Sequence, residues 1–218
     1  MIDYILDTTS VPTFSKNKPQ QLIVLCHGYG GDGNDISTLA INWRRFLPDA
    51  IFLCPNAPET CAVNPQGYQW FDLTKEKDEI ILEKSLVAEE KLSLFIEQAL
   101  DNFQLEHNDL ALIGFSQGCM MSIQVALKKN KQINSLIGYS GKIINQKHLS
   151  NNIKSKPKIL LMHGENDPIV SPTHLLEAKE FLHKNGIKSK TKIFKNCEHK
   201  IPTEGVSLGL TFLKKNLL

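Results

Sequence analysis

The sequence has no long hydrophobic run, little net charge and no nucleotide-binding motif. No apolar stretch reaches the roughly 20 residues that a membrane-spanning helix needs, so we expect no integral membrane segment. The net charge of the 218 residues is only +2, whereas a nucleic-acid partner usually requires a basic face. Neither a Gly-Lys-Ser/Thr run nor a Gly-x-Gly-x-x-Gly turn is present. We therefore predict no nucleic-acid partner.

The cysteines and histidines do not form the patterns of a disulfide framework or a metal site. The five cysteines are odd in number and include no Cys-x-x-Cys pair, as is typical of free thiols in a reducing cytosol. The first residues lack a basic region followed by an apolar core, the pattern of a secretory signal. No histidine pair has the helical spacing of metal ligands. We predict a cytoplasmic protein with no metal and no cofactor.

What the sequence does have is a regular alternation of short apolar runs with helical patterns. Apolar, β-branched runs predict buried strands, and apolar positions that recur at helical spacing predict amphipathic helices. Strands are expected at residues 22–26, 51–53, 110–113, 135–139, 158–162 and 191–194, with a candidate edge strand at residues 4–6. Helices are expected at about residues 34–46, 78–104, 117–129, 172–185 and 206–217, the first capped by Asn34 or Asp35.

This alternation predicts an α/β fold in a single domain, residues 1–218, with a mostly parallel central sheet and helices on both faces. Right-handed crossovers place the turns after parallel strands at one edge of the sheet. The turns that follow Cys26, Phe115, Tyr139, Met162 and Phe194 are therefore expected to be neighbours. Two connections are longer: residues 145–156, with room for one short helix, and residues 55–74.

Residues 114–118 read Gly-Phe-Ser-Gln-Gly, between a predicted strand and a predicted helix. In such a turn, side chains two residues before and after the serine would collide, which requires glycine at both positions. The hydroxyl of Ser116 is then exposed at the end of a strand. The amide of Gln117 opens the next helix, where free donors and the helix dipole favour an oxyanion. The pattern predicts a nucleophilic serine, although a plain glycine-rich turn with a capping serine would read the same way.

A serine hydroxyl needs a base to remove its proton, and seven histidines are available. We prefer His199, which follows the last predicted strand and lies downstream of the candidate acids. His27 and His163 begin His-Gly turns at strand ends, where an imidazole commonly packs and ties loops together. The other four lie before a strand, in a polar loop or on a helix: His107, His148, His174 and His183.

Asp167 is the preferred acid, because it follows a predicted strand by a few residues and Pro168 keeps it extended. A carboxylate beside the base fixes its tautomer and stabilises its protonated form. Glu165 and Asp72 are weaker alternatives. The chain order Ser116, Asp167, His199 is that of α/β-hydrolases.

A second oxyanion donor is expected in the glycine-dense turn after the strand at residues 22–26. In hydrolases of this order the second donor comes from a turn after an early strand. The amide of Tyr29, between Gly28 and Gly30, is the best candidate to act with the amide of Gln117. Glycine at these positions lets the backbone approach a substrate closely.

Six segments, in order, resemble the phospholipase/carboxylesterase family, the acyl-protein thioesterase-like branch of the α/β-hydrolases. They are His27-Gly28-Tyr29-Gly30, Cys54-Pro55-Asn56-Ala57-Pro58, Trp70-Phe71-Asp72, Gly114-Phe115-Ser116-Gln117-Gly118, His163-Gly164-Glu165-Asn166-Asp167-Pro168-Ile169-Val170 and His199-Lys200-Ile201. The resemblance implies the α/β-hydrolase fold, with Ser116 as nucleophile, Asp167 as acid and His199 as base. It also implies oxyanion donors at Tyr29 and Gln117, and a site near Trp70.

The expected function is that of a serine hydrolase that cleaves short to medium acyl esters, with lysophospholipids and acyl-thioesters as further candidate substrates. A dienelactone-hydrolase-like or peptidase-like hydrolase of the same fold stays open, as does a catalytically silent binding protein. We expect substrate contacts from Gly28, Trp70, Phe71 and Ser140. The aromatic segment at residues 68–71 has three interpretations: a pocket wall, a plug in the core, or one face of a homodimer.

Overall fold

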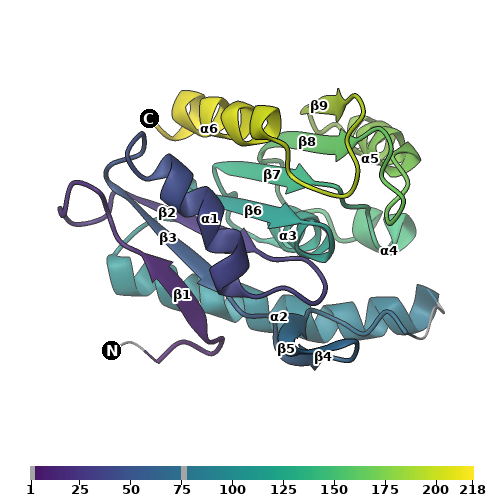
Figure 1. Cartoon of the computed structure of the whole chain (residues 1–218), viewed down its shortest axis with the longest axis horizontal. Coiled ribbons are helices and arrows are strands. Elements are labelled where there is room, and N and C mark those ends of the chain that lie inside the picture. The colour runs from purple at the N-terminus through teal and green to yellow at the C-terminus, as the bar shows by residue number, and fades with distance from the viewer. Residues whose placement is uncertain (1–2, 75–77) are drawn as a thin grey trace.

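The structure is a computed structural model that describes residues 3–74 and 78–218; residues 1–2 and 75–77 of the predicted domain 1–218 lie outside the described residues. Within the described residues, a seven-stranded sheet has the order β1-β3-β2-β6-β7-β8-β9 (Figure 1). All neighbouring strands are parallel except β1 and β3. The strands are β1 (Thr8–Val11), β2 (Gln21–Cys26), β3 (Ala50–Pro55), β6 (Leu110–Phe115), β7 (Ser135–Tyr139), β8 (Lys158–Gly164) and β9 (Ser189–Phe194).

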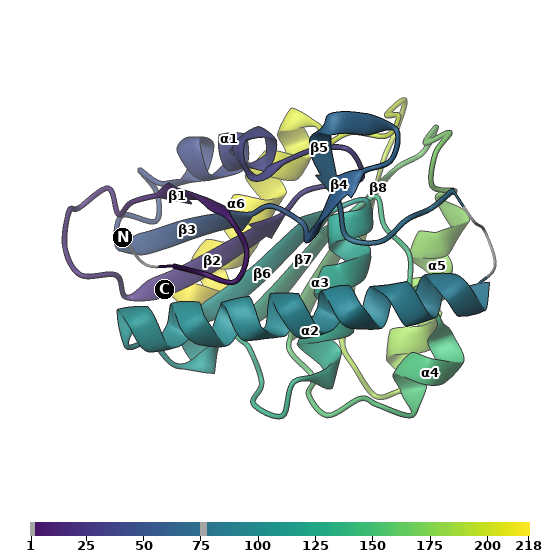
Figure 2. The ribbon, with the colours of Figure 1, turned by 90° about the horizontal axis from the view of Figure 1, so that it is seen from below.

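Helices cover both faces of this sheet, as predicted. Figure 2 shows α1 and α6 on one face, and α2, α3, α4 and α5 on the other. The helices are α1 (Gly33–Trp43), α2 (Asp78–Phe103), α3 (Gln117–Lys128), α4 (Gln146–Ser150), α5 (Thr173–Lys184) and α6 (Thr203–Leu217). A short 3-10 helix, His107–Asp109, precedes β6.

The two layers of helix create two hydrophobic cores, one on each face of the sheet. On the first face Trp43 of α1 and Leu213 of α6 pack against inner-strand residues such as Ile113. On the other face Phe95 of α2 and Met121 of α3 pack against the same strands. Strands that are buried on both faces need apolar side chains at every position. This requirement explains why β2, β6 and β7 read as nearly continuous apolar runs.

The structure differs from the prediction in two places, at one edge of the large sheet and in the connection after β3. The edge strand is β1 at Thr8–Val11 rather than residues 4–6, and it pairs antiparallel with β3. The connection at residues 55–74 contains a two-stranded hairpin, β4 (Glu59–Cys61) with β5 (Asn64–Gln69). Both elements are short, polar and partly exposed, so they lack the apolar pattern by which the inner strands are recognised.

The helix predictions hold, with one correction at a cap. The first helix is capped by Asp32, whose side chain accepts a hydrogen bond from the amide of Asp35 at 2.7 Å, and not by Asn34 or Asp35 themselves. The short helix expected within residues 145–156 is α4. Gly186 follows the end of α5 with φ of +68°, the left-handed conformation expected after a helix. None of the helices in the described ranges is long and apolar enough to cross a bilayer.

Candidate active site

The turn between β6 and α3 has the geometry of a nucleophile elbow. Ser116 has φ of +53° and ψ of −117°, a strained conformation for a residue other than glycine. A Cβ at Gly114 would overlap the backbone of Gly118, and a Cβ at Gly118 would overlap the carbonyl oxygens of Cys26 and His27. Glycine is therefore required at both positions, as the sequence suggested. The turn places the Ser116 side chain at the carboxyl edge of the sheet, at the start of α3.

The structure brings together the three residues predicted as nucleophile, base and acid. His199 lies in the loop between β9 and α6, and its Nε2 atom is 2.9 Å from Oγ of Ser116. Its Nδ1 atom is 2.7 Å from Oδ2 of Asp167, in the loop after β8. Because a carboxylate only accepts, Nδ1 donates to Asp167, which leaves Nε2 to accept from the Ser116 hydroxyl. The ring of His199 packs against Phe115, with 4.9 Å between ring centroids.

The carboxylate of Asp167 is buried and fully supported by hydrogen bonds. Its Oδ1 atom accepts from the amides of Ile169 and Val170, each at 2.9 Å. Burial raises the pKa of Asp167, but the bonds from Val170, His199 and Ile169 outweigh burial and hold it below its ordinary value. Asp167 is therefore ionised at neutral pH, as a partner that stabilises a protonated imidazole must be.

The alternative acids have other partners. Asp72 pairs with Lys84, with 3.1 Å between Oδ2 and Nζ. Oε2 of Glu165 accepts a long, weak hydrogen bond from the amide of Asn196, at 3.4 Å. Neither is hydrogen-bonded to His199, whose carboxylate partner is Asp167.

The backbone amides of Gln117 and Tyr29 belong to two segments that lie beside Ser116. The amide of Gln117 opens α3, where the first N–H groups of a helix have no partner within the helix. The loop Gly28–Tyr29 lies against the nucleophile, since a Cβ at Gly28 would lie 3.2 Å from Cβ of Ser116. The backbone hydrogen bonds of the described residues include none donated by the amide of Tyr29 or Gln117.

Three of the residues expected to contact substrate are buried. Trp70 and Phe71 have no exposed surface and belong to the core beneath α2 and α3, so the core-plug interpretation describes them. Ser140 is 1% exposed, and its Oγ has no hydrogen-bond partner among the described residues. Of the four predicted contact residues, Gly28 alone lines the cavity described below.

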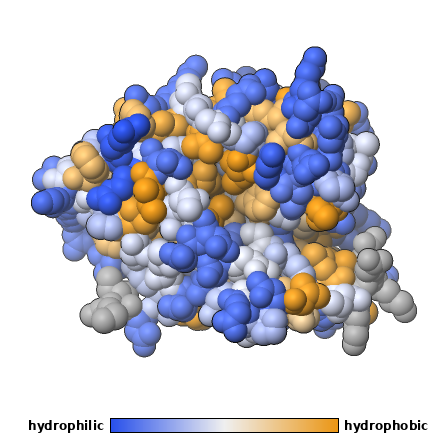
Figure 3. Space-filling view, in the orientation of Figure 1, coloured by the Kyte–Doolittle hydropathy of each residue, from blue (hydrophilic) through white to orange (hydrophobic). Residues whose placement is uncertain are grey.

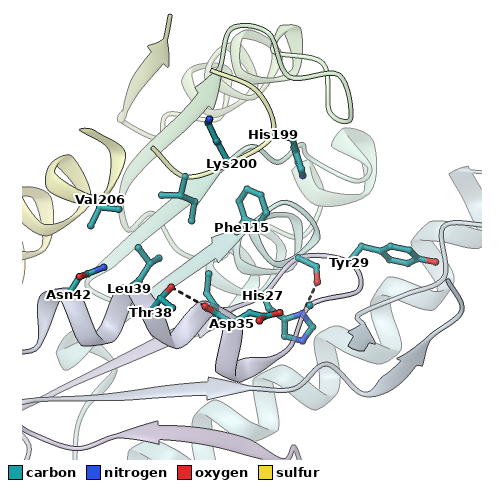
Figure 4. A pocket seen from close by; sticks show the side chains of 14 residues that line it. His27, Tyr29, Asp35, Thr38, Leu39, Asn42, Phe115, His199, Lys200 and Val206 are labelled. Atoms are coloured by element: carbon teal, nitrogen blue, oxygen red, sulfur yellow. Dashed lines mark hydrogen bonds between the residues drawn. The ribbon is translucent and has the colours of Figure 1, made fainter. Parts of the chain in front are cut away.

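An open cavity of about 480 Å³ lies between α1 and the loop that carries His199 (Figure 4). Its floor is apolar, formed by Leu39, Phe115, Ile201 and Val206. Its polar rim comprises Asp35, Thr38 and Asn42 on α1, and Lys200 on the opposite side. In Figure 3, apolar surface gathers in the same region, between α1 and α6. Phe115, Lys200 and Ile201 stand in segments that the sequence singles out, although not as cavity residues. No motif marks the residues on α1 and α6, which share only their position on elements that meet at this edge.

Four of the six remaining histidines have well-defined partners. His107 contacts Glu97 at 3.1 Å and His174 contacts Glu177 at 2.7 Å. Both His27 and His163 are 1% exposed and bind backbone groups at strand ends. The five cysteines are free and buried, which confirms the prediction of free thiols. Among the described residues, no group of three His, Cys, Asp or Glu side chains is arranged to hold a metal ion.

A family model, curated relatives and solved structures that resemble this chain all point to esterases and thioesterases. A family model described as Phospholipase/Carboxylesterase matches residues 10–217. Esterase YpfH of Escherichia coli is 26% identical over 205 residues, covering 92% of this chain and 85% of the relative. Acyl-protein thioesterase 1 of Saccharomyces cerevisiae is 28% identical over 218 residues, covering 91% and 93%. The crystal structure of esterase PE8 superposes with a TM-score of 0.93 at 34% identity, covering 97% of this chain and 99% of that one.

Proposed function

The chain belongs to the phospholipase/carboxylesterase family of α/β-hydrolases and cleaves ester bonds, and we propose that it does so through an acyl-enzyme at Ser116. In this proposal His199 is the general base and acid, and Asp167 orients it. The observation that carries the proposal is the unbroken line of hydrogen bonds from Ser116 through His199 to Asp167, at 2.9 and 2.7 Å.

In the first half of the reaction, Oγ of Ser116 attacks the ester carbonyl carbon while Nε2 of His199 takes the hydroxyl proton. The carbonyl oxygen becomes an oxyanion, which accepts hydrogen bonds from the amides of Tyr29 and Gln117. The tetrahedral intermediate collapses when His199 returns the proton to the leaving alkoxide. An alcohol departs, and an acyl group stays on Ser116.

In the second half, a water molecule attacks the acyl carbon, and His199 takes one of its protons. The second oxyanion binds the same two amides. Collapse breaks the bond to Oγ, the proton returns to Ser116, and a carboxylic acid leaves. Each preorganised oxyanion donor of this kind typically contributes about 3–4 kcal/mol to lowering the barrier.

The cavity beside His199 supports short to medium ester substrates. Its volume of about 480 Å³ lies within the range of about 300–1,000 Å³ that is usual for small-molecule sites. An apolar floor suits a hydrocarbon group, and the rim of Asp35, Asn42 and Lys200 suits a polar group beyond it. We propose a carboxylic ester with one group of moderate length as the substrate class, and lysophospholipids and acyl-thioesters as alternatives for the test.

The proposal is tested with purified protein and nitrophenyl esters of increasing acyl length, beside a lysophospholipid and an acyl-thioester. We expect hydrolysis with a maximum at short or medium length, lost in Ser116→Ala to the background rate. Preference for the thioester or the lysophospholipid would replace the substrate class and keep the mechanism. Absence of turnover by folded wild-type protein would favour a silent binding protein, and preference for a peptide or lactone would favour the other hydrolase classes.

Two further predictions concern self-association and cellular location. We do not extend the proposal to a homodimer through residues 68–71, because Gln69, Trp70 and Phe71 are buried within the chain. The oligomeric state is measurable by sedimentation of the purified protein. We propose a cytoplasmic location, which the five free thiols support.

A further inference from the structure

The buried imidazole of His27 binds the loop that carries Tyr29. Its Nδ1 atom lies 2.7 Å from the carbonyl oxygen of Gly28, which can only accept, so Nδ1 donates. Its Nε2 atom accepts a hydrogen bond from the amide of Ala57 at 2.9 Å. Both ring nitrogens are therefore occupied by backbone groups, and the two contacts are compatible with one neutral tautomer only. Figure 4 shows the bond from His27 to the Gly28 carbonyl at the end of the cavity.

The bond to Gly28 sets the direction of the Tyr29 amide. The Gly28 carbonyl and the Tyr29 N–H belong to one planar trans peptide, so they point in opposite directions. The carbonyl is held by His27 and also by the amide of Gly31, at 3.2 Å. The N–H of Tyr29 then faces the opposite side of the loop. Gly28 packs against Ser116, so this peptide and its donor lie beside the proposed nucleophile.

Trp70 connects this loop to Gln117, whose amide is the other proposed oxyanion donor. Its indole Nε1 donates to the carbonyl of His27 at 3.0 Å, and its backbone amide donates to Oε1 of Gln117 at 2.9 Å. The Gln117 side chain in turn donates to the carbonyl of Phe71 at 2.6 Å. All these groups are fully or almost fully buried. The aromatic segment therefore lies behind both amides, and not in the path of the substrate.

We propose that His27 is a positioning residue, whose Nδ1–H bond to the Gly28 carbonyl orients the Tyr29 amide for the oxyanion, and that Trp70 fixes this loop relative to Gln117. The inference rests on the proposed function, because an oriented donor matters for catalysis only if Ser116 forms a tetrahedral intermediate. In this inference His27 is not the catalytic base and Trp70 does not contact the substrate. Both residues instead position the loop that carries Tyr29.

The electrostatics of the ring agree with this role. Burial lowers the pKa of His27 below its ordinary value and outweighs the favourable contacts with Gly28, Asp32 and Asp35. The ring is thus neutral at neutral pH. A proton on Nε2 would meet the N–H of Ala57, so protonation would break the contact that holds the ring in place.

Two substitutions separate the two bonds of His27. The amide nitrogen of asparagine reaches the position of Nδ1, so His27→Asn retains a donor for Gly28 and loses the acceptor for Ala57. The longer glutamine reaches the position of Nε2, so His27→Gln retains an acceptor for Ala57 and loses the donor for Gly28. Trp70→Phe removes the indole donor and keeps an aromatic ring. His183→Gln, an exposed histidine on α5, serves as the control.

We expect kcat for a short nitrophenyl ester to fall about 10- to 100-fold in His27→Gln, less than the 10²–10³-fold loss of an entire oxyanion donor. In His27→Asn the loss of kcat should be several-fold smaller than in His27→Gln. The KM should change little in either variant. The affinity for a trifluoromethyl ketone, which forms an oxyanion on Ser116, should decline in parallel with kcat. Equal losses in both variants, or losses confined to KM, would overturn the proposal.

A substrate-free measurement keeps this inference distinct from the proposed function. In ¹⁵N NMR spectra of wild-type protein, we expect His27 as the neutral tautomer with its proton on Nδ1. The Tyr29 amide signal should shift strongly in His27→Gln and weakly in His27→Asn. The opposite tautomer, or an unchanged Tyr29 signal in His27→Gln, would overturn the inference even if the enzyme is active. Wild-type protein without esterase activity would instead refute the proposed function.

Discussion

The Nε2 atom of His163 lies 3.2 Å from Oδ2 of Asp167, the same carboxylate oxygen that contacts His199. The His163 ring also lies 2.8 Å from the carbonyl oxygen of Val170, to which Nε2 donates. Asp167 is thus held between two imidazoles and two backbone amides. This arrangement links the stability of the folded chain to pH.

Stability should decrease as the pH falls below the ordinary histidine pKa of 6.5. Burial is the main cause that lowers the pKa of both His163 and His27 in the folded chain. Below pH 6.5 the unfolded chain therefore binds more protons, and stability is lost until the lower folded pKa values are reached. The lowered pKa of Asp167 adds a further loss as the pH falls below its ordinary value of 3.8.

His163→Gln should make this pH dependence shallower, because one buried histidine no longer contributes. Glutamine retains a donor for Val170, so the fold should persist. Urea unfolding at pH 7.5 and pH 5.5 gives the free energies to compare, with a difference in slope of up to about 1.4 kcal/mol per pH unit for one group. If the free energy of unfolding changed equally with pH in wild type and variant, His163 would not contribute to the pH dependence of stability.

Asp167→Asn should lower kcat by about 10⁴-fold, because an amide donor opposite Nδ1 favours the wrong tautomer of His199. The asparagine oxygen can still accept from Ile169 and Val170, so the loop should keep its conformation. Asp72→Asn is the matched control, since Asp72 pairs with Lys84. Steady-state hydrolysis of a nitrophenyl ester gives both values. A large loss in the control and none in Asp167→Asn would reverse the choice of acid.

Val206→Trp should restrict hydrolysis to esters with shorter chains, because the indole would fill the apolar floor of the cavity. We expect kcat/KM for acetyl esters to stay near wild type and kcat/KM for longer esters to decline. One series varies the acyl group with nitrophenol fixed, and another varies the alcohol with acetate fixed. The series that loses its long members identifies the group that enters the cavity.

Thr211→Trp, at an exposed position of α6, is the control for this change. An unaltered length profile in Val206→Trp, in both series, would show that the cavity between α1 and the His199 loop does not bind the substrate.

Thiol reagents should not inactivate the folded enzyme. Burial raises the pKa of Cys26 and of Cys119 to about 12, so neither is a thiolate near neutral pH. All five cysteines are buried. We expect iodoacetamide at pH 8 to leave activity intact over hours, and to label the thiols after unfolding. Rapid inactivation of the folded protein would point to a reactive cysteine in catalysis.

The inner part of the fold was predictable because its strands are buried on both faces. Residues 22–26 and 110–113 are apolar at every position, and this pattern has few other interpretations. The edge strand β1, Thr-Thr-Ser-Val, has one buried side chain and no alternation that distinguishes it from a loop. The hairpin β4–β5 was hidden for the same reason, because most of its side chains are exposed. Tyr68 of β5 also exchanges backbone hydrogen bonds with Gly30 and Gly31 in the loop after β2, a contact that no local pattern indicates.

The hydrogen-bonded group of Ser116, His199 and Asp167 was predictable because the proposed chemistry restricts its members to few residue types at the ends of strands. Ser116, Asp167 and His199 each follow a strand that the apolar pattern locates. The position of Trp70 in the core was not predictable in this way, since an aromatic residue in a loop fits a pocket wall and a core equally well. Its two hydrogen bonds, to His27 and Gln117, depend on the three-dimensional packing of three separate loops.

Labelling with a fluorophosphonate, followed by peptide mapping, tests the central claim most directly. The probe reacts preferentially with a serine that a neighbouring base activates, and it leaves a stable adduct. We predict one adduct, on Ser116, that is absent from folded Ser116→Ala and strongly reduced in His199→Ala. A folded wild-type protein that does not react, or an adduct on another residue that persists in Ser116→Ala, would contradict the account.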